Sequence, residues 1–272
     1  MITLRSAREI EAMRRSGKIT AKVLTDLMQA AKPGMTTADV DALAEKGIRD
    51  LGGEPTFKGY RGYPASVCTS VNDRVVHGIP GGETLREGDL LSIDLGTTLE
   101  GYVSDSAVTV AIGDVSAEAR RLLDVTQECL MLGIEQMRSG NHVGDIGHAV
   151  QQHAEASGYG VVRVLVGHGV GTSMHEDPQV PNYGKPGTGA KMRPGLVLAV
   201  EPMITQGTDE VKILEDGWTV VTADGKLAAH FEHTIALTQE GPRILTLREF
   251  GEHAEAAKYR PRHDQEHLVR SI

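Results

Sequence analysis

Residues 92–110, SIDLGTTLEGYVSDSAVTV, predict two β-strands joined by a short turn. A mostly apolar run comes first, turn-forming residues follow, and residues 102–110 then alternate with the period of a strand. With the turn centred near residues 99–100, Asp94 and Asp105 lie opposite each other, about 5 Å apart at Cβ. Two carboxylates that close in an apolar sheet repel each other unless a cation or a proton lies between them. A single Asp more often faces water, but the pair indicates a cation site.

The composition is that of an ordinary globular protein, with 272 residues of which 40% are hydrophobic and 24% charged. The formal net charge of −9 and the lack of a long basic run argue against nucleic acid or an anionic membrane as the main partner. Cys68 and Cys129 suit neither a disulfide framework nor a zinc finger, which favours a reducing compartment. The N-terminal sequence lacks the apolar core of a signal peptide, and no apolar run approaches the ~20 residues of a membrane-spanning helix. We expect a cytoplasmic monomer.

Helix and strand signals follow one another in a similar order in the two halves of the chain. Ser6 and Glu9 form a capping-box signature that starts a helix, which Pro33-Gly34 ends, and Thr36 or Thr37 caps the next helix. The other expected elements are a strand over residues 66–71, helices from Ser116 to Ser139-Gly140 and over residues 143–157, strands over residues 161–166 and 196–202, and a hairpin over residues 218–237 turning at Asp224-Gly225.

An internal duplication supports this order. Residues 86–95, REGDLLSIDL, match residues 193–202, RPGLVLAVEP, and so align Asp94 with Glu201. Two further matches occur in the same order, and they pair Gly34 with Gly140, Asp39 with Asp145, and the His-x-x-Pro segments starting at His77 and His175. We therefore predict an α+β fold of two helix–helix–sheet halves, related by a pseudo-twofold axis around a central antiparallel sheet.

A single domain over residues 1–246 is expected, followed by a charged C-terminal extension over residues 247–272. Large apolar residues are sparse in this extension, and a solvated or partly helical segment is its most natural interpretation. A metal-binding role is less favoured for its three histidines, which are His253, His263 and His267.

Five candidate metal ligands come from both halves: Asp94, Asp105, His168, Glu201 and Glu232. Glu201 lies in the apolar run VLAVEP, which reads as a buried strand rather than a water-facing one. Four carboxylates carry a charge of about −4, which one divalent cation half compensates and two neutralise. Oxygen ligands with one nitrogen and no thiolate suit Mn²⁺, Fe²⁺ or Co²⁺, with Zn²⁺ as a further alternative. A hydroxide bridging two ions about 3.5–4 Å apart is a nucleophile at neutral pH.

Two loops next to this cluster carry groups suited to contacting a substrate. His77 and His175 occupy equivalent positions in the two halves, which favours a substrate contact over an exposed surface role. Such a histidine can donate a hydrogen bond to a developing oxyanion or to a substrate amide. Phe57, Tyr60 and Tyr63 cluster in a chain with only 4% aromatic residues, which favours a pocket lining.

The sequence closely resembles the type I methionine aminopeptidases of the bacterial, single-domain kind, which have the pita-bread fold. The resemblance covers about residues 6–246 and rests on SVNDRVVHGIP, IDLG, GYVSDSA, GHGVGTSMHEDPQVPNYG, LVLAVEPM, EDGWTVVTADG and HFEHTIALT. It implies two divalent metal ions (Co, Mn, Fe or Zn), with Asp94 on one, His168 and Glu201 on the other, and Asp105 and Glu232 bridging both. It also implies that the substrate amine binds beside Asp94, that Glu201 handles the proton, and that His77 and His175 contact the scissile peptide.

The activity implied by the resemblance is removal of the initiator methionine from nascent proteins, near the ribosome, when the second residue is small. The candidate methionine pocket consists of Tyr60, Tyr63, Cys68, Met174 and Trp218. An apolar, sulfur-lined slot suits a flexible thioether side chain.

The chain departs from the family pattern at three positions that border the expected pocket. Phe57, Arg61 and Met174 stand where the family commonly has Cys, His and Phe, so the shape of the pocket is expected to differ. Two other functions are considered. A proline-specific peptidase of the same fold usually carries a large extra N-terminal domain, and a non-catalytic binding module, like a metal-free hydrolase of this fold, lacks metal ligands that this chain retains.

Overall fold

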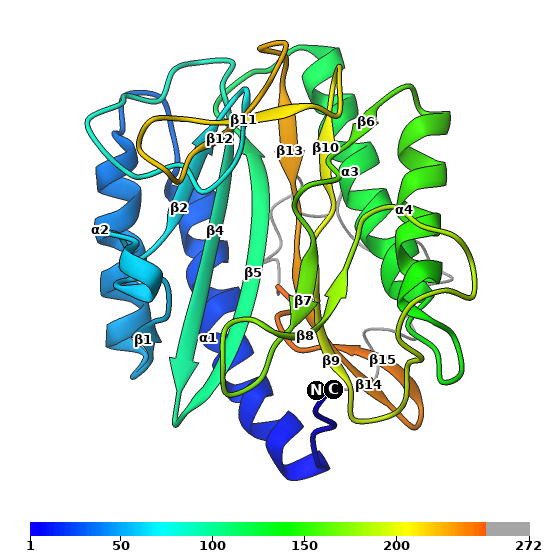
Figure 1. Cartoon of the computed structure of the whole chain (residues 1–272). Helices are drawn as coiled ribbons and strands as arrows, with labels where there is room; N and C mark the ends of the chain where they lie inside the picture. Colours follow the sequence, from blue (N-terminus) through cyan, green and yellow to red (C-terminus); the bar gives the residue numbers. More distant parts are fainter. Residues whose placement is uncertain (249–272) are drawn as a thin grey trace.

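The computed structural model describes residues 1–248, so the interpretation of His253, His263 and His267 concerns residues outside it. The helices of the described part are α1 (Ala7–Ala30), α2 (Thr37–Asp50), the short η1 (Tyr60–Gly62), α3 (Ala117–Glu135) and α4 (Val143–Ala156). Its strands are β1 (Glu54–Pro55), β2 (Cys68–Val71), β3 (Arg74–Val76), β4 (Leu90–Leu99), β5 (Tyr102–Ala111), β6 (Gly160–Val161), β7 (Gly167–Gly169), β8 (Glu176–Val180), β9 (Val197–Val200), β10 (Met203–Thr205), β11 (Val211–Ile213), β12 (Val220–Thr222), β13 (Ala228–His230), β14 (His233–Thr238) and β15 (Gly241–Ile244) (Figure 1).

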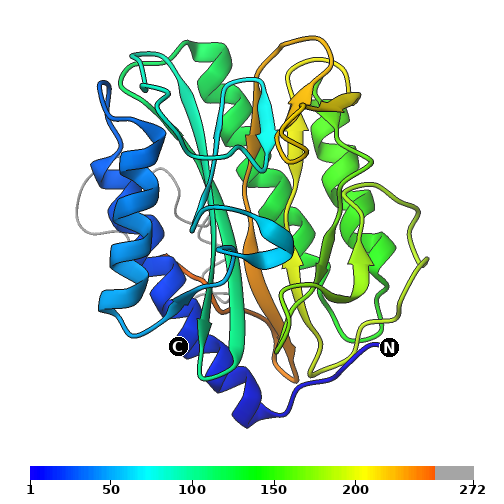
Figure 2. The same ribbon diagram turned by 60° about the vertical axis from the view of Figure 1, so that its left-hand side comes forward.

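Two larger antiparallel sheets form the centre of the molecule. In the first, β4 pairs with β5 along one edge and with β2 and β1 along the other. The second has the order β15-β14-β9-β7-β8, and two smaller sheets, β13-β10-β6 and β11-β12-β3, complete the set. Helix α1 packs on β4 and β5, while α3 packs on β9, β10 and β13, with α2 and α4 alongside them (Figures 1 and 2). The predicted α+β class with antiparallel sheets is confirmed.

The first two helices begin where the capping signals predict. Ser6 Oγ accepts from the Glu9 N–H at 3.4 Å, and the Glu9 carboxylate accepts from the Ser6 N–H at 2.8 Å. Thr36 and Asp39 form the same reciprocal pair, at 3.1 and 2.8 Å, which selects Thr36 over Thr37 as the cap of α2. Each pair satisfies two backbone donors that a helix start otherwise leaves without partners.

The hydrophobic core lies between these helices and the two larger sheets. Leu24 of α1, Leu91 of β4, Leu122 of α3 and Leu198 of β9 are each 0% exposed. Truncating a leucine buried to this extent typically costs about 2–5 kcal/mol, because a cavity is left behind. This core supports strands β4, β5 and β9 from behind, so that their opposite faces are free to carry polar groups.

The central hairpin is present, but its register differs from the prediction. The turn is centred on Glu100 and Gly101, both with positive φ, as a two-residue hairpin turn requires. Asp94 therefore pairs with Ala107, and Asp105 pairs with Gly96, so the two aspartates are diagonal neighbours rather than directly opposite. Moving the centre by one residue shifts each pairing by two residues, which preserves the face of the sheet. Both carboxylates consequently still point to the same side.

The predicted hairpin over residues 218–237 is wrong. Strand β12 pairs with β11 and β3, β13 pairs with β10, and β14 pairs with β9 and β15. The turn at Asp224-Gly225 exists, with φ of +72° at Gly225, but it joins strands of different sheets. The predicted strand over residues 161–166 is also shorter, because β6 ends at Val161 and β7 begins only at Gly167. These pairings depend on distant partners, which local alternation does not specify.

The duplicated segments have matching backbone conformations. Gly34 and Gly140, which precede α2 and α4, have φ of +91° and +97°. Asp145 accepts from the His142 N–H at 2.6 Å at the start of α4, as Asp39 does at the start of α2. These positive φ values favour glycine, since a Cβ atom is disfavoured there. The two halves thus share the same backbone conformation and the same capping interaction at the start of their second helix.

Candidate metal centre

The five candidate ligands converge where the two larger sheets meet. Asp94 lies on β4, Asp105 on β5 and His168 on β7, while Glu201 follows β9 and Glu232 precedes β14. Strand pairing fixes three of them, and the short segments after β9 and β13 direct the two glutamates to the same place. The sequence-predicted set is therefore brought together in space.

The ligand atoms lie within reach of a shared ion. One ligand atom from each of Asp105, His168 and Glu232 lies within 4.8 Å of the others. His168 Nε2 is 3.7 Å from Asp105 Oδ2 and 3.5 Å from Glu201 Oε1. The side chains are nearly closed off from solvent, with Asp94 8%, Asp105 3% and Glu232 1% exposed.

Burial has opposite effects on the acids and on the imidazole of this cluster. Burial first, and then the neighbouring carboxylates, raise the pKa values of Asp94, Glu201 and Glu232 well above their usual range. Burial also raises the pKa of Asp105 to about 7. Burial and the neighbouring His175 lower the pKa of His168 to about 3. The imidazole is therefore neutral, and its approaches to the carboxylates are not ion pairs.

The donor set fits a divalent cation. His168 Nδ1 lies 2.9 Å from the Gly169 carbonyl, which can only accept, so Nδ1 carries the proton and Nε2 presents a lone pair. That lone pair faces carboxylate oxygens of Asp105 and Glu201, an arrangement that a cation between them makes favourable. Asp94 Oδ1, Asp105 Oδ1 and Glu232 Oε1 are buried without a hydrogen-bond partner. Buried acceptors of this kind are costly unless they coordinate an ion or hold a proton.

A cavity of about 180 Å³ opens in front of the cluster. The residues that line it include all five candidate ligands and every predicted pocket residue, namely Phe57, Tyr60, Tyr63, Cys68, His77, Met174, His175 and Trp218. Trp218 stacks edge-on against Tyr63 at 5.1 Å and against His77 at 6.5 Å between ring centroids. Aromatic rings and the sulfur-containing side chains of Cys68, Met174 and Met203 thus line the same cavity as the carboxylates.

His175 contacts two neighbouring rings, those of Tyr60 and His168. Tyr60 Oη lies 2.9 Å from His175 Nδ1, and the two rings stack with centroids 5.5 Å apart. The centroid of the His168 ring lies 4.2 Å from that of His175, with the two planes tilted by 39°. Burial and the positive charge of Arg61 lower the pKa of His175. The ring is neutral near pH 7, so one nitrogen can donate while the other accepts.

The loop that carries His175 is anchored by the N-terminal segment. The Arg5 guanidinium donates to both oxygens of Glu176 at 2.6 Å, and the Arg5 side chain is only 7% exposed. Glu176 Oε1 also accepts from the N–H groups of Thr172 and Ser173 at 3.0 and 3.2 Å. One carboxylate thus closes the loop directly before His175.

Two residues near the centre were missed by the sequence predictions. His230 is 1% exposed, neither ring nitrogen has a hydrogen-bond partner, and its Nε2 lies 3.7 Å from Glu201 Oε2. Arg248 is 7% exposed and donates to Ser106 Oγ at 2.9 Å. The alternation of HFEHT placed His230 on the face of Glu232, but the apolar run before Arg248 gave no sign of a polar contact.

The site consists of buried carboxylates and one neutral imidazole, and it opens to an apolar cavity. Such a site is typical of metal-dependent hydrolases. The family model described as metallopeptidase family M24 matches residues 11–239. A methionine aminopeptidase of Clostridium acetobutylicum is 53% identical over 248 residues, which cover 91% of this chain and 99% of that protein. The crystal structure of a methionine aminopeptidase from Thermotoga maritima superposes with a TM-score of 0.90 at 44% identity, covering 92% of this chain and 100% of the other.

A prolidase from Pyrococcus furiosus has a TM-score of 0.74 at 22% identity, over 91% of this chain and 66% of that one, which shows a shared fold alone. The chain therefore belongs to metallopeptidase family M24 and, within it, to the type I methionine aminopeptidases of the bacterial kind. It is an aminopeptidase of the hydrolase class, and its fold is the pita-bread fold of that family. Within residues 1–248, no helix is long and apolar enough to cross a membrane.

Proposed function

We propose that the protein removes the N-terminal methionine from newly made cytoplasmic proteins when the second residue is small, using two divalent ions. The observation that carries this proposal is the group of buried, unpartnered carboxylate oxygens facing the His168 lone pair, in the wall of an apolar cavity. Four carboxylates match the charge of two divalent ions, which supports a dinuclear site over a mononuclear one.

Each ligand has a specific place in the proposed site. Asp94 would hold one ion, His168 and Glu201 the other, and Asp105 and Glu232 would be shared. When bound, such ions polarise the scissile carbonyl and lower the pKa of a coordinated water. Mn²⁺, Fe²⁺, Co²⁺ and Zn²⁺ all suit an oxygen-rich set with one imidazole.

The protein's own groups then orient the peptide and move protons. Asp94 attracts the substrate amine, and Glu201 takes up a proton and returns it to the leaving amine. Tyr60 Oη lies 2.9 Å from His175 Nδ1, and in the proposed mechanism Tyr60 is the donor of this hydrogen bond, so that the Nε2–H can donate to the developing oxyanion. His77, whose pKa is lowered to about 4 by burial and by His175, stays neutral and can contact the peptide from the opposite loop.

The cavity suits an unbranched thioether side chain. Its apolar walls include the rings of Tyr63 and Trp218 and the sulfur atoms of Cys68 and Met174. Sulfur and aromatic contacts favour methionine, although an apolar pocket discriminates only about 10–200-fold per methylene, so norleucine should be partly accepted. Crowding by His77 and the Arg61 loop would restrict the second residue.

The experiment that tests this function measures release of the first residue from the peptides Met-X-Gly-Met, with X running from Gly, Ala and Ser to Leu and Ile. Rates should fall steeply for residues larger than Val. Equal rates for Ala and Leu at X, or faster release of Leu than of Met, would refute the specificity. Faster cleavage of an Ala-Pro peptide would instead support a proline-specific enzyme.

The two-ion centre is tested separately. Asp105→Asn and Glu232→Gln should each lower turnover by several orders of magnitude while the circular dichroism spectrum stays unchanged. Metal analysis of the same samples should show fewer than two ions per chain. Substantial turnover by either variant after treatment with a chelator would overturn the two-ion mechanism.

A further inference from the structure

The seam between the two larger sheets is joined by side-chain hydroxyls. Within the described residues β5 and β14 belong to different sheets, although they lie side by side (Figure 1). Thr234 Oγ1 accepts from the Asp105 N–H at 2.9 Å and donates to the Asp105 carbonyl at 2.8 Å. Ser106 Oγ donates to the Glu232 carbonyl at 2.6 Å. The two ligands proposed to be shared by both ions thus face each other across this seam.

Arg248 lies behind the seam and contacts both of its sides. Its guanidinium donates to Ser106 Oγ at 2.9 Å, next to Asp105 in the sequence, and lies 3.5 Å from His233 Nε2, next to Glu232. None of Ser106, His233 and Arg248 lines the cavity, so these contacts are on the side turned away from the substrate.

The charge of Arg248 also belongs to this centre. The side chain is buried, and among residues 1–248 no carboxylate comes close enough to form an ion pair with it. A buried guanidinium without an ion-pair partner among residues 1–248 is costly, and the charge of Glu232 stabilises its protonated form. The positive charge of the Arg248 guanidinium in turn offsets part of the negative charge of the carboxylate cluster.

We propose that Arg248 is a positioning residue that clamps β5 to β14 and thereby fixes the separation of Asp105 and Glu232 for metal binding. The inference rests on the proposed metal-dependent function. The planar guanidinium has several donors in a rigid fork, so it can reach a hydroxyl on one strand and an imidazole on the other. A lysine has the same charge but a single donor group, and a methionine fills the space without either.

The test compares Mn²⁺ binding to chelator-treated wild-type protein, Arg248→Lys and Arg248→Met, by isothermal titration calorimetry. Loss of a residue that orients metal ligands typically weakens binding about 10–100-fold. We expect such a loss for Arg248→Met and a smaller one for Arg248→Lys. Excess Mn²⁺ should restore much of kcat in both, with the KM for Met-Ala-Gly-Met unchanged.

Ile48→Ala is the matched control, because Ile48 is fully buried in α2, whose main contacts are with α1, β1 and β2 rather than with β5 or β14. It should lower thermal stability as much as the Arg248 variants do but leave Mn²⁺ affinity unchanged. If Arg248→Met fails to fold, Mn²⁺ affinity is compared in Arg248→Lys and Thr234→Val instead, since both substitutions leave a side chain of similar volume in the core. Wild-type Mn²⁺ affinity in the folded variants, or an equal loss in Ile48→Ala, would overturn the proposal. A wild-type protein that binds no divalent ion would instead reject the proposed function itself.

Discussion

At the scale of single residues, the orientation of His175 gives a direct test of its role. Tyr60 stacks on His175 and its Oη lies 2.9 Å from Nδ1, and a hydrogen bond donated by Tyr60 would leave Nε2 as the free donor. Removing one oxyanion donor typically lowers kcat about 10²–10³-fold. We expect His175→Ala to show this loss with an unchanged metal content, and Tyr60→Phe to show a smaller loss. Steady-state kinetics with metal analysis checks both, and a normal kcat in His175→Ala rejects the role.

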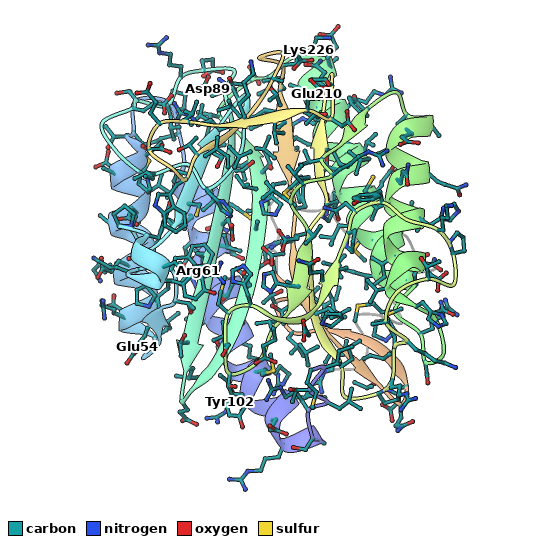
Figure 3. The ribbon with its side chains drawn as sticks, viewed as in Figure 1. Glu54, Arg61, Asp89, Tyr102, Glu210 and Lys226 are labelled. Carbon is teal, nitrogen blue, oxygen red and sulfur yellow. The ribbon has the colours of Figure 1, made fainter. Side chains whose placement is uncertain are left out.

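Arg61 should influence the choice of substrate beyond the second residue. Arg61, which Figure 3 labels, is exposed and lines the cavity. Its guanidinium carbon lies 5.3 Å from the centroid of the Tyr60 ring. An exposed ion pair contributes about 0.2–1 kcal/mol, so kcat/KM for Met-Ala-Glu peptides should exceed that for Met-Ala-Lys peptides about 2–5-fold at low salt. Amidated peptides of five or more residues avoid an effect of the terminal carboxylate.

Two variants separate this effect of Arg61 from the overall charge of the protein. Arg61→Glu should invert the preference between the two peptides. Lys58→Gln removes a positive charge three residues away, but Lys58 is bonded to Glu45 outside the cavity, so the preference should persist. The same preference in Arg61→Glu as in the wild type would contradict the prediction.

At the scale of the elements, local signals were the most reliable. The capping box at Ser6 depends on residues three positions apart and lies where the sequence predicts it, while the structure selects Thr36 from the two threonines predicted to cap α2. Strand partners were harder to predict, since β13 pairs with β10 rather than with β12 across the turn at Asp224-Gly225. Register was predicted only to within a shift of two residues, because it depends on which two residues adopt positive φ.

The same distinction applies to the candidate site. The five candidate ligands could be predicted because duplication and motif spacing mark them in the sequence, and the structure brings them together. Arg248 could not, because its contacts with Ser106 and His233 form only when the end of the described chain packs behind the sheets. Leu247 and Arg248 lie beyond the predicted boundary at residue 246, yet both pack against the body of the molecule.

The capping carboxylate of α4 should stabilise the protein in a pH-dependent way. Its hydrogen bond from the His142 N–H lowers the pKa of Asp145 below its usual value. A lowered pKa contributes stability that is fully present above about pH 4 and is lost as the pH falls through the folded-state value. Asp145→Asn keeps an acceptor but not the charge, so urea denaturation should show it to be less stable than the wild type at pH 7.

The difference between Asp145→Asn and the wild type should shrink below about pH 4, where both side chains are uncharged. Performing all measurements in EDTA keeps the metal state constant across this pH range. A difference that is constant down to pH 3 would mean that the charge of Asp145 is not what stabilises the start of α4.

At the scale of the whole molecule, two similar halves meet along a seam that contains the carboxylate cluster. Each half alone supplies only part of the ligand set, with Asp94 and Asp105 from one and His168, Glu201 and Glu232 from the other. A divalent cation bound between the halves would therefore connect them, and binding to the folded state alone would raise the free energy of unfolding. Removal of metal should accordingly destabilise the entire fold rather than one loop.

This destabilisation should increase with pH. Without cations, burial raises the pKa values of Asp94, Glu201 and Glu232, so the folded state retains protons that the unfolded chain releases above about pH 4–5. Since the folded state then binds more protons, its stability falls as the pH rises from about 5 to 8. The melting temperature in EDTA should fall over this range, whereas with Mn²⁺ it should change little. In EDTA, Glu232→Gln should flatten the dependence of the melting temperature on pH. The control Asp114→Asn, at an exposed position, should leave this dependence unchanged. Parallel curves of melting temperature against pH with and without Mn²⁺ would contradict this prediction.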